Sequence, residues 1–397
     1  MIQLRVVLSG LFMLLLLGGC DKYFGDKTDL DFIEVPEFQP REIAYVPIQP
    51  AWEGFSEPSD IIAGFDELIY VVDRVREEII AFDESGRELG SMKVQGVRSV
   101  AQDRRLNLLA IGTYTDTVAG VPYDLTCLYR IALNGASGYG IRNARILNKI
   151  VHPFYFKSTF SASDRLVTFN KVAVLEDNSY YVTRSGQSNN PNQFGGPDDG
   201  ILLFSDRDSL LTPVVVTTSG GGFFNNYFKK PFSIASFVQP PQISARGGKE
   251  FIYTSVDDNS VIKVQVIDYL ESEFGASYAP RSMEFEDYTK AEGFLISPYK
   301  FKTPRSVTIA GDQSQYIFVV DESKDSVYQF TITGLEGVKP PPGSADTKYQ
   351  MASFGGKGKA LNKFDRPVAV AYKNRIIYVA DAGNGRVLRF KLTTDFD

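Results

Sequence analysis

The sequence has one histidine, His152, and two cysteines, Cys20 and Cys127, in a chain of 397 residues. Zinc sites and nucleophilic catalytic triads are built from several side chains of these kinds. This shortage excludes zinc enzymes and hydrolases that depend on such clusters. Calcium is held by carboxylate and amide oxygens, which the chain has in quantity, so the same argument does not exclude a calcium-dependent enzyme.

An excess of basic residues is also missing. The chain has 42 lysines and arginines against 48 aspartates and glutamates, which gives a formal net charge of −6. A protein that binds a nucleic-acid backbone needs a basic surface to neutralise phosphates. We therefore expect no nucleic-acid partner.

Cys20 ends a short N-terminal segment that differs from the rest of the chain. Arg5 is followed by an apolar run over residues 6–17 and then by LGGC at 17–20. The run is too short to span a membrane and has the length of a secretory signal core. LGGC resembles the bacterial lipobox, which implies cleavage before Cys20 and lipid attachment to its side chain. The predicted organisation is a signal peptide at 1–19, a lipid-anchored linker at 20–40 and one folded domain at 41–397.

Cys127 is then left without a partner for an intrachain disulfide. It lies in the apolar run LTCLYRIAL at 125–133. A small side chain in such a run is expected to be buried and unreactive.

The folded domain is a repeat of short β-strands. Apolar runs recur between turns rich in glycine, asparagine and aspartate, which is typical of consecutive antiparallel strands. The second strand of the repeat appears six times, as LIYVVD at 68–73, LLAIG at 108–112, YYVTR at 180–184, FIYTSV at 251–256, YIFVVD at 316–321 and IIYVAD at 376–381. Prolines mark the start of four units, namely Pro58, Pro241, Pro304 and Pro367. The spacing to the third strand is 11 or 12 residues in four units and 22 or 23 in the other two.

The last unit, residues 358–390, resembles the NHL repeat through P-x-x-V-A, IYVAD and N-x-R-V-x-x-F. This resemblance implies an all-β, six-bladed β-propeller whose blades pack around a channel. The last unit stops after its third strand and leaves an edge that another segment should cover. We expect the run from Ile43 to Ile48 to supply that outer strand, so that an N-terminal strand closes the ring.

Asp73, Asp321 and Asp381 each end a second strand just before a tight turn. A short carboxylate at this place accepts backbone N–H bonds. Because the three residues recur at equivalent positions, we interpret them as structural turn caps. No catalytic or metal-binding residue is predicted.

The remaining candidates lie in four insertions, at 113–123, 185–199, 219–239 and 289–303. In a four-stranded meander, the turn between the second and third strands and the connection between blades emerge on the same face, here named the loop-rich face. The segment SGGGFFNNYFKKPF at 219–232 allows two interpretations, a connection that packs its aromatics against the ring or an aromatic finger that faces a partner. Aromatic residues are enriched at binding hot spots. The partner-binding candidates are Tyr114, Tyr123, Phe194, Phe223, Phe224, Tyr227, Phe228, Lys229, Lys230, Tyr299 and Phe301.

These features predict a non-enzymatic binding or scaffold subunit of the bacterial cell envelope that engages a protein partner through the loop-rich face. Two alternatives stay open, a calcium-dependent lactonase-like or lyase-like propeller enzyme and a glycan-binding lipoprotein of a nutrient uptake system. No cofactor is expected, and calcium belongs only to the enzyme alternative. The lipid would hold the protein at a membrane. The outer membrane is favoured, although Asp21 after the lipidated cysteine would favour the inner membrane under the enterobacterial sorting rule.

Replacing Cys20 with serine should abolish lipid attachment and release or mislocalise the protein, because the lipobox cysteine carries the lipid. Mass spectrometry of the mature wild-type N-terminus should show an acylated cysteine. A mature protein that keeps residues 1–19, or that starts elsewhere, would contradict the prediction.

Overall fold

A computed structural model describes residues 43–151, 163–192, 196–218, 222–241, 248–273, 275–283, 286–340 and 344–396. Cys20, His152 and Phe194 lie outside the described residues. Within the described ranges, no helix is both long enough and apolar enough to cross a bilayer.

The described chain forms six antiparallel sheets of at least four strands each. Blade 1 contains β2 (Pro58–Ala63), β3 (Ile69–Asp73), β4 (Glu78–Phe82) and β5 (Glu88–Lys93). Blade 2 contains β6 (Ser99–Gln102), β7 (Leu108–Val118), β8 (Val121–Ala132) and β11 (Arg145–Val151). Blade 3 contains β12 (Thr168–Val174), β13 (Tyr180–Ser185), β14 (Gly200–Phe204) and β15 (Leu210–Pro213).

Blade 4 contains β18 (Pro231–Ser236), β19 (Phe251–Ser255), β20 (Val264–Ser272) and β21 (Gly275–Pro280), with β16 (Val216–Thr217) and β17 (Phe223–Phe224) added outside. Blade 5 contains β22 (Pro304–Ile309), β23 (Ile317–Asp321), β24 (Ser326–Phe330) and β25 (Phe354–Gly355). Blade 6 contains β26 (Pro367–Lys373), β27 (Ile376–Asp381), β28 (Arg386–Leu392) and β1 (Tyr45–Glu53). A small hairpin of β9 (Asn134–Gly135) and β10 (Gly138–Tyr139) precedes β11.

The helical elements among the described residues are short 3-10 turns. They are η1 (Ile141–Asn143), η3 (Asp164–Leu166), η4 (Glu322–Lys324), η5 (Ala382–Asn384) and η6 (Thr393–Asp395).

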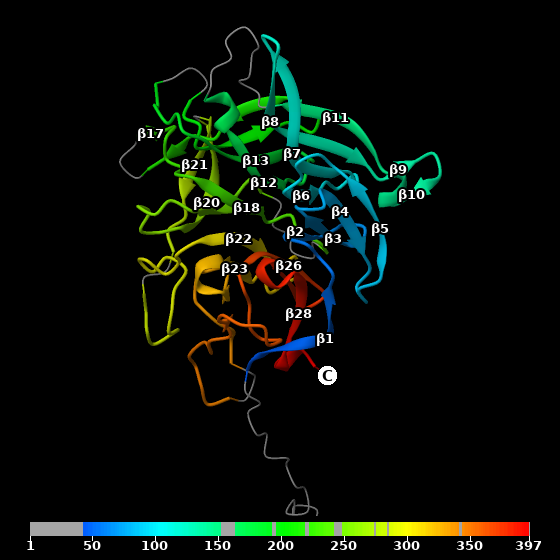
Figure 1. The fold of residues 1–397 in the computed structure, drawn as a ribbon. Helices are drawn as coiled ribbons and strands as arrows, with labels where there is room; N and C mark the ends of the chain where they lie inside the picture. The colour runs from blue at the N-terminus through cyan, green and yellow to red at the C-terminus, as the bar shows by residue number, and fades with distance from the viewer. Residues whose placement is uncertain are drawn as a thin grey trace, which may run out of the picture. The chain divides into compact units, whose positions relative to one another are not determined.

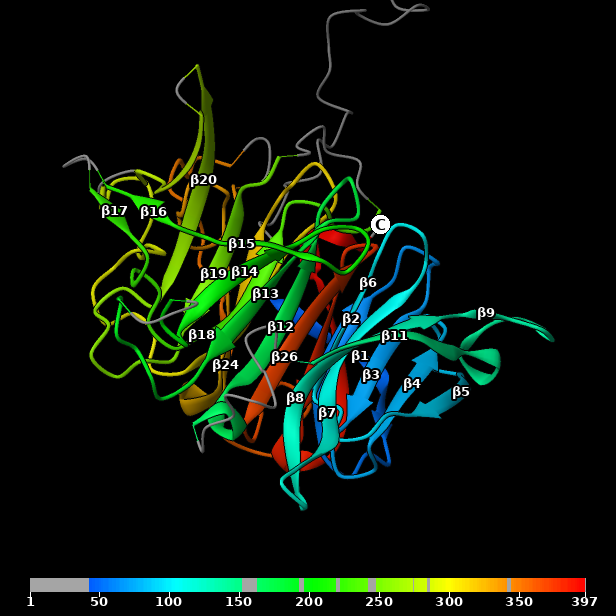
Figure 2. The same ribbon diagram turned by 90° about the horizontal axis from the view of Figure 1, so that it is seen from above.

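The first strands of the six blades surround a common axis. Each contacts the first strand of the next blade, in the order β2, β6, β12, β18, β22, β26 and back to β2, and Figure 1 shows them grouped around the centre. Figure 2 shows the β7–β8 hairpin and β20 extending toward opposite faces of the ring. The prediction of an all-β, six-bladed propeller is confirmed.

The hydrophobic core lies between the blades. Six main clusters of buried side chains each join two neighbouring blades. The second strands read as continuous apolar runs because both of their faces are covered, and every residue of β3, β19 and β23 is buried. Cys127 is fully buried in the cluster between blades 1 and 2, and burial raises the pKa of its thiol to about 12.

The outer strand of blade 6 comes from the start of the described chain. β1 pairs antiparallel with β28, from Tyr45 opposite Leu392 to Glu53 opposite Arg386. The strand runs over Tyr45–Glu53, further than the 43–48 run that the sequence indicated. It carries Trp52 into the core between blades 6 and 1, where the indole stacks on Phe82 with ring centres 5.0 Å apart.

Two sequence expectations are wrong in detail. The first strand of blade 4 starts at Pro231, which lies opposite Ser255, whereas Pro241 follows that strand. The insertion at 113–123 is not a loop, because β7 and β8 continue as a paired hairpin to Val118 and Val121. Cross-strand hydrogen bonds thus satisfy the backbone of that insertion.

Deleting Ile43 to Glu53 should lower the melting temperature and promote aggregation. The deletion would uncover the edge of β28, lose backbone hydrogen bonds worth about 0.5–1.5 kcal/mol each and expose the pocket of Trp52. Thermal melts and light scattering would measure both effects, with deletion of residues 21–36 as a control that we expect to be nearly neutral. Equal stability of the two deletion variants would contradict this role of β1.

Candidate functional site

A cavity of about 520 Å³ opens on the loop-rich face where the first strands begin, and we name it the channel mouth. Its wall includes the blade connection at Glu57, the turns between second and third strands at Arg74 and Glu322, and strand starts from all six blades. Ligand-binding sites in proteins typically have volumes of about 300–1,000 Å³. The channel mouth therefore has the size of a small-molecule site.

The same backbone irregularity builds this wall in five blades. The register of the first strand against the second shifts right after the strand starts, at Pro58, Phe169, Pro231, Pro304 and Pro367. A β-bulge of this kind changes the direction of the residues that it contains and is often found beside functional sites. Here it places successive residues at the channel.

The channel mouth is lined by two rings of side chains, which we name the outer ring and the inner ring. The outer ring consists of Ser59, Arg98, Asn170, Phe232, Arg305 and Val368. The inner ring, one residue later in five of the six blades, consists of Asp60, Ser99, Lys171, Ser233 and Ser306.

Three inner-ring side chains bond to the first strand of the next blade. Asp60 Oδ2 accepts a hydrogen bond from the Val100 backbone N–H at 2.9 Å. Ser233 Oγ accepts one from Val307 at 3.1 Å, and Ser306 Oγ accepts one from Val370 at 3.2 Å. These residues satisfy backbone donors that would otherwise be buried without partners.

Asp60 also links two blades across the channel. Its carboxylate accepts hydrogen bonds from Lys171 Nζ at 2.5 and 2.6 Å, from Ser99 Oγ at 2.8 Å and from its neighbour's backbone amide at 3.0 Å. Both side chains of the ion pair are largely buried. With all of its acceptor positions used, the Asp60 carboxylate has a structural role.

The outer ring contains two arginines at the channel mouth, Arg98 and Arg305, with different surroundings. Arg305 pairs with Glu322 at 2.5 Å and lies over the ring of Phe232 at 4.6 Å. The Arg98 guanidinium, in contrast, has no ion pair or side-chain hydrogen bond among the described residues. Burial, together with the charge of Arg74, lowers the pKa of Arg98 below its usual value.

The three aspartates at the ends of the second strands accept backbone N–H bonds. Asp73 accepts from Ser56 at 2.6 Å and from Glu57 and Arg76 at 3.2 Å each. Asp321 accepts from four backbone amides, those of residues 302, 303, 323 and 324.

Asp381 accepts the backbone N–H of Asp365 at 2.7 Å and pairs with Arg386 at 2.9 Å. Burial raises the pKa of Asp381, although these partners oppose the shift. Each of the three carboxylates thus ties its own turn to the connection that precedes the blade.

The structure separates the aromatic candidates into exposed and buried groups. Phe223, Phe224 and Tyr299 are 78%, 42% and 73% exposed, and Lys229 and Lys230 are exposed as well. Tyr114 and Tyr123 are partly buried on the β7–β8 hairpin, with Lys149 Nζ 3.2 Å from the centre of the Tyr114 ring. Tyr227 is partly buried and donates a hydrogen bond to Gln265 at 2.5 Å.

Two candidates are wrong as surface residues. Phe228 is buried in the core between blades 3 and 4, and Phe301 is buried in the core between blades 4 and 5. Their connections run close enough to the ring for these side chains to enter the spaces between blades. Neither side chain can be an exposed partner-binding anchor.

Phe223 and Phe224 do not face the channel. They form β17, which pairs with β16, while β16 pairs in parallel with the fourth strand β21. The aromatic segment is therefore the outermost edge of blade 4, at the periphery of the ring (Figure 2).

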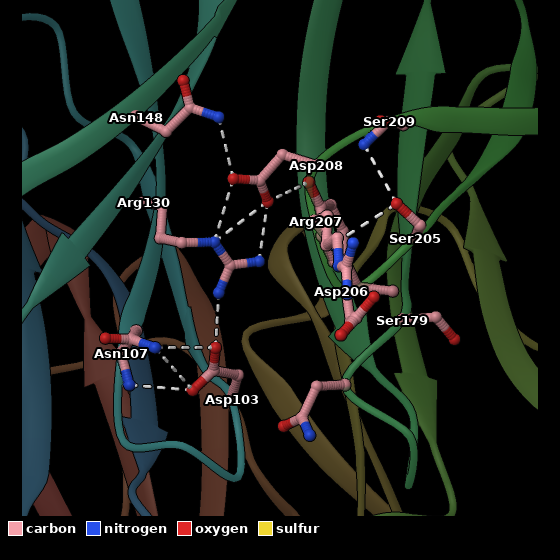
Figure 3. A network of polar contacts seen from close by, with 12 residues as sticks. Asp103, Asn107, Arg130, Asn148, Ser179, Ser205, Asp206, Arg207, Asp208 and Ser209 are labelled. Atoms are coloured by element: carbon pink, nitrogen blue, oxygen red, sulfur yellow. Dashed lines mark hydrogen bonds and ion pairs between the residues drawn. The ribbon is translucent and has the colours of Figure 1, made fainter.

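A buried polar network that the sequence analysis missed joins blades 2 and 3 (Figure 3). Arg130 of β8 donates to Asp208 through Nε at 3.0 Å and Nη2 at 2.6 Å, and its Nη1 donates to Asp103. Asn148 adds a hydrogen bond to Asp208 at 2.9 Å. Burial acts to raise the pKa of Asp208, but the bonds from Arg130 and Asn148 outweigh it and hold the pKa below its usual value.

This network has a structural role. Asp103 and Asp208 lie in turns on the face opposite the loop-rich face, and each guanidinium nitrogen of Arg130 has an aspartate partner. The sequence signal was a single arginine inside the buried run LTCLYRIAL. A charge in such a strand indicates a paired partner, but the partner comes from another blade.

A second cavity, also of about 520 Å³, is lined by Tyr45, Asp312, Tyr316, Tyr372 and their neighbours. It is formed mainly by blades 5 and 6 and does not lie on the axis. Among the described residues, no group of three or more His, Cys, Asp or Glu side chains could hold a metal ion.

Comparison with solved structures finds other proteins of the same fold. The chain is similar to the PQQ-bound aldose sugar dehydrogenase of Streptomyces coelicolor, with 11% identity, 89% of this chain and 99% of that chain covered, and a TM-score of 0.51. It is similar to a structural genomics protein of unknown function from Bacteroides thetaiotaomicron, with 13% identity, coverage of 88% and 72%, and a TM-score of 0.49. It is also similar to an auxiliary nutrient binding protein from Bacteroides ovatus, with 12% identity, 85% of this chain and 70% of that chain covered, and a TM-score of 0.49.

The similarity to the Streptomyces coelicolor structure shows the fold alone. No protein-family model matches the chain, and no curated protein matches it.

Replacing Arg130 with methionine should lower the free energy of unfolding by about 3–5 kcal/mol, because it leaves two buried carboxylates without their cation. Urea unfolding would measure the loss. Arg207→Met is the matched control, since Arg207 is exposed in the turn that carries Asp208. Equal effects of the two substitutions would contradict the network's role.

The Arg130 effect should also depend on pH. The pKa of Asp208 in the folded protein lies below its usual value of 3.8. The ionised Asp208 carboxylate therefore contributes its full stabilisation above pH 3.8, and this stabilisation is lost as the pH falls through the folded pKa. The difference between wild type and Arg130→Met should therefore shrink from about pH 5 to about pH 3.

Proposed function

We propose that the protein is a lipid-anchored binding protein of the bacterial cell envelope whose ligand enters the channel mouth on the loop-rich face. The channel mouth itself carries this proposal, because a cavity of about 520 Å³ is built by strand starts from every blade. Lipidation at Cys20, the NHL-like character of the repeats and the envelope location are part of the proposal and rest on the sequence.

The side chains of the two rings make different kinds of contact, and this difference supports ligand binding at the channel mouth. Three of the five inner-ring side chains bond to the first strand of the next blade. In the outer ring, Ser59 and Asn170 also bond to backbone carbonyls of the next blade. Among the described residues, the other four outer-ring side chains make no such bond, and they present arginine, phenylalanine and valine to the channel mouth. Such a mixture of apolar, aromatic and polar groups is typical of ligand sites.

A protein partner is a second candidate, favoured by the outer edge of blade 4. Among the described strands, β17 pairs on one side only, and it exposes both Phe223 and Phe224. An unpaired edge that carries exposed aromatics can accept an added strand from another chain. This edge and the channel mouth would act separately.

Blocking the channel mouth tests the first proposal. Val368→Trp should fill the space, whereas Val75→Trp adds the same bulk to an exposed turn on the same face, outside the lining. Each protein would be immobilised and exposed to envelope extract, and the captured compounds and proteins would be compared by mass spectrometry. We expect Val75→Trp to retain the wild-type set and Val368→Trp to lose at least one component by tenfold or more.

Unchanged capture by Val368→Trp would contradict the channel mouth as the binding site. A Phe223→Ala and Phe224→Ala double variant that loses a protein component, while Leu211→Ala keeps it, would assign that partner to the edge of blade 4. Leu211 is a suitable control because it is 57% exposed on the outer strand of blade 3.

A further inference from the structure

In the part of the chain that the structure describes, one cation of the channel mouth, Arg98, has no counterion. Its wall has five cationic side chains, Arg74, Arg98, Lys171, Arg305 and Arg366, and four acidic ones, Glu57, Asp60, Glu77 and Glu322. One positive charge is therefore in excess in a protein whose formal net charge is −6.

The contacts show which of these cations has no carboxylate beside it. Glu57 binds Arg74 with both carboxylate oxygens at 2.8 Å and also lies 3.8 Å from Arg366. Lys171 forms an ion pair with Asp60, and Arg305 forms one with Glu322.

Glu77 is exposed and accepts the Gly96 backbone N–H at 2.9 Å. Arg98 remains, partly buried, with its guanidinium unpaired among the described residues. Its neighbour Ser59 bonds to the backbone carbonyl of Arg98 at 3.0 Å and leaves the side chain free.

A partly buried guanidinium loses hydration, and a second guanidinium at Arg74 repels it. An anion bound at Arg98 would remove both costs. The planar fork of arginine matches the two oxygens of a carboxylate. A phosphate monoester carries about −1.5 to −2 charges near neutral pH, which exceeds the single charge available in the wall.

We propose that Arg98 binds the carboxylate of a small, singly charged ligand, of the size of a sugar acid, in the channel mouth. This inference rests on the proposed function and adds the chemical class of the ligand. The ligand carboxylate lies against the Arg98 guanidinium, and the outer-ring groups of the other blades surround the rest of the molecule.

Calorimetric titration of the intact mature domain tests this proposal with three probes. Glucuronate carries the carboxylate, glucuronamide has the same shape without the charge, and glucose 6-phosphate carries a double charge. Wild type should bind glucuronate at least tenfold more tightly than either of the other probes. Arg98→Met should lose at least tenfold in glucuronate affinity, and Arg207→Met, which removes an exposed charge on the opposite face, should keep it.

Arg98→Lys should fall between wild type and Arg98→Met, because lysine keeps the charge and loses the fork. Melting temperatures of all variants would show that they are folded. If Arg98→Met fails to fold, the lysine variant and the wild-type preference among probes still decide the question.

Equal affinity for glucuronate and glucuronamide, tighter binding of glucose 6-phosphate, no binding of glucuronate by wild type, or unchanged affinity in Arg98→Met would each overturn the proposal. Any of these results combined with loss of capture in Val368→Trp would leave the channel mouth as a binding site for another ligand. Unchanged capture in Val368→Trp would instead reject the site itself.

Discussion

The ring depends on hydrogen bonds that cross from one first strand to the next. Each first strand has an edge that turns toward its neighbour, and a buried N–H group without a partner costs about 1–3 kcal/mol. Asp60, Ser233 and Ser306 supply acceptors to the N–H groups of Val100, Val307 and Val370 at the same register. Short polar side chains are thus required at these positions. In the adjacent outer ring, Ser59 and Asn170 add bonds to the next blade, and among the described residues the other four side chains make no such bond. Because of the bulge at the strand start, one residue can bond to the next blade while the residue beside it faces the channel mouth.

Much of the fold could be predicted because the second strands are buried on both faces. Full burial turns β3, β23 and β27 into nearly continuous apolar runs whose spacing survives insertions. The error at blade 4 has a simple cause. Pro241 lies 12 residues before Tyr253, the same spacing as from Pro58 to Tyr70. Only the pairing of Pro231 with Ser255 shows which proline starts the strand. Phe228 was misjudged because the sequence of a connection does not show which side chains turn toward the core.

The channel mouth escaped prediction for a different reason. Its outer ring takes one residue from each blade, so its members are scattered from Ser59 to Val368 and form no motif. The prolines that marked the repeats were the available signal, since Ser59, Arg305 and Val368 each follow such a proline directly. Arg98 follows Val97 instead, and its place in the ring emerges only from the alignment of the six first strands in space.

Two arginines of blade 2 differ in whether the fold itself compensates their charge. Arg130 is buried, and its guanidinium donates to Asp103 and Asp208 through Nη1, Nε and Nη2. Its removal would leave anions uncompensated, so its charge is explained within the fold. Arg98 is partly buried at the channel, and within the described residues no carboxylate compensates it. Desolvating a cation without a counterion destabilises the folded protein, and no described side chain pairs with Arg98 to offset this cost. The missing negative charge is therefore best supplied from outside the chain, by the ligand of the channel mouth.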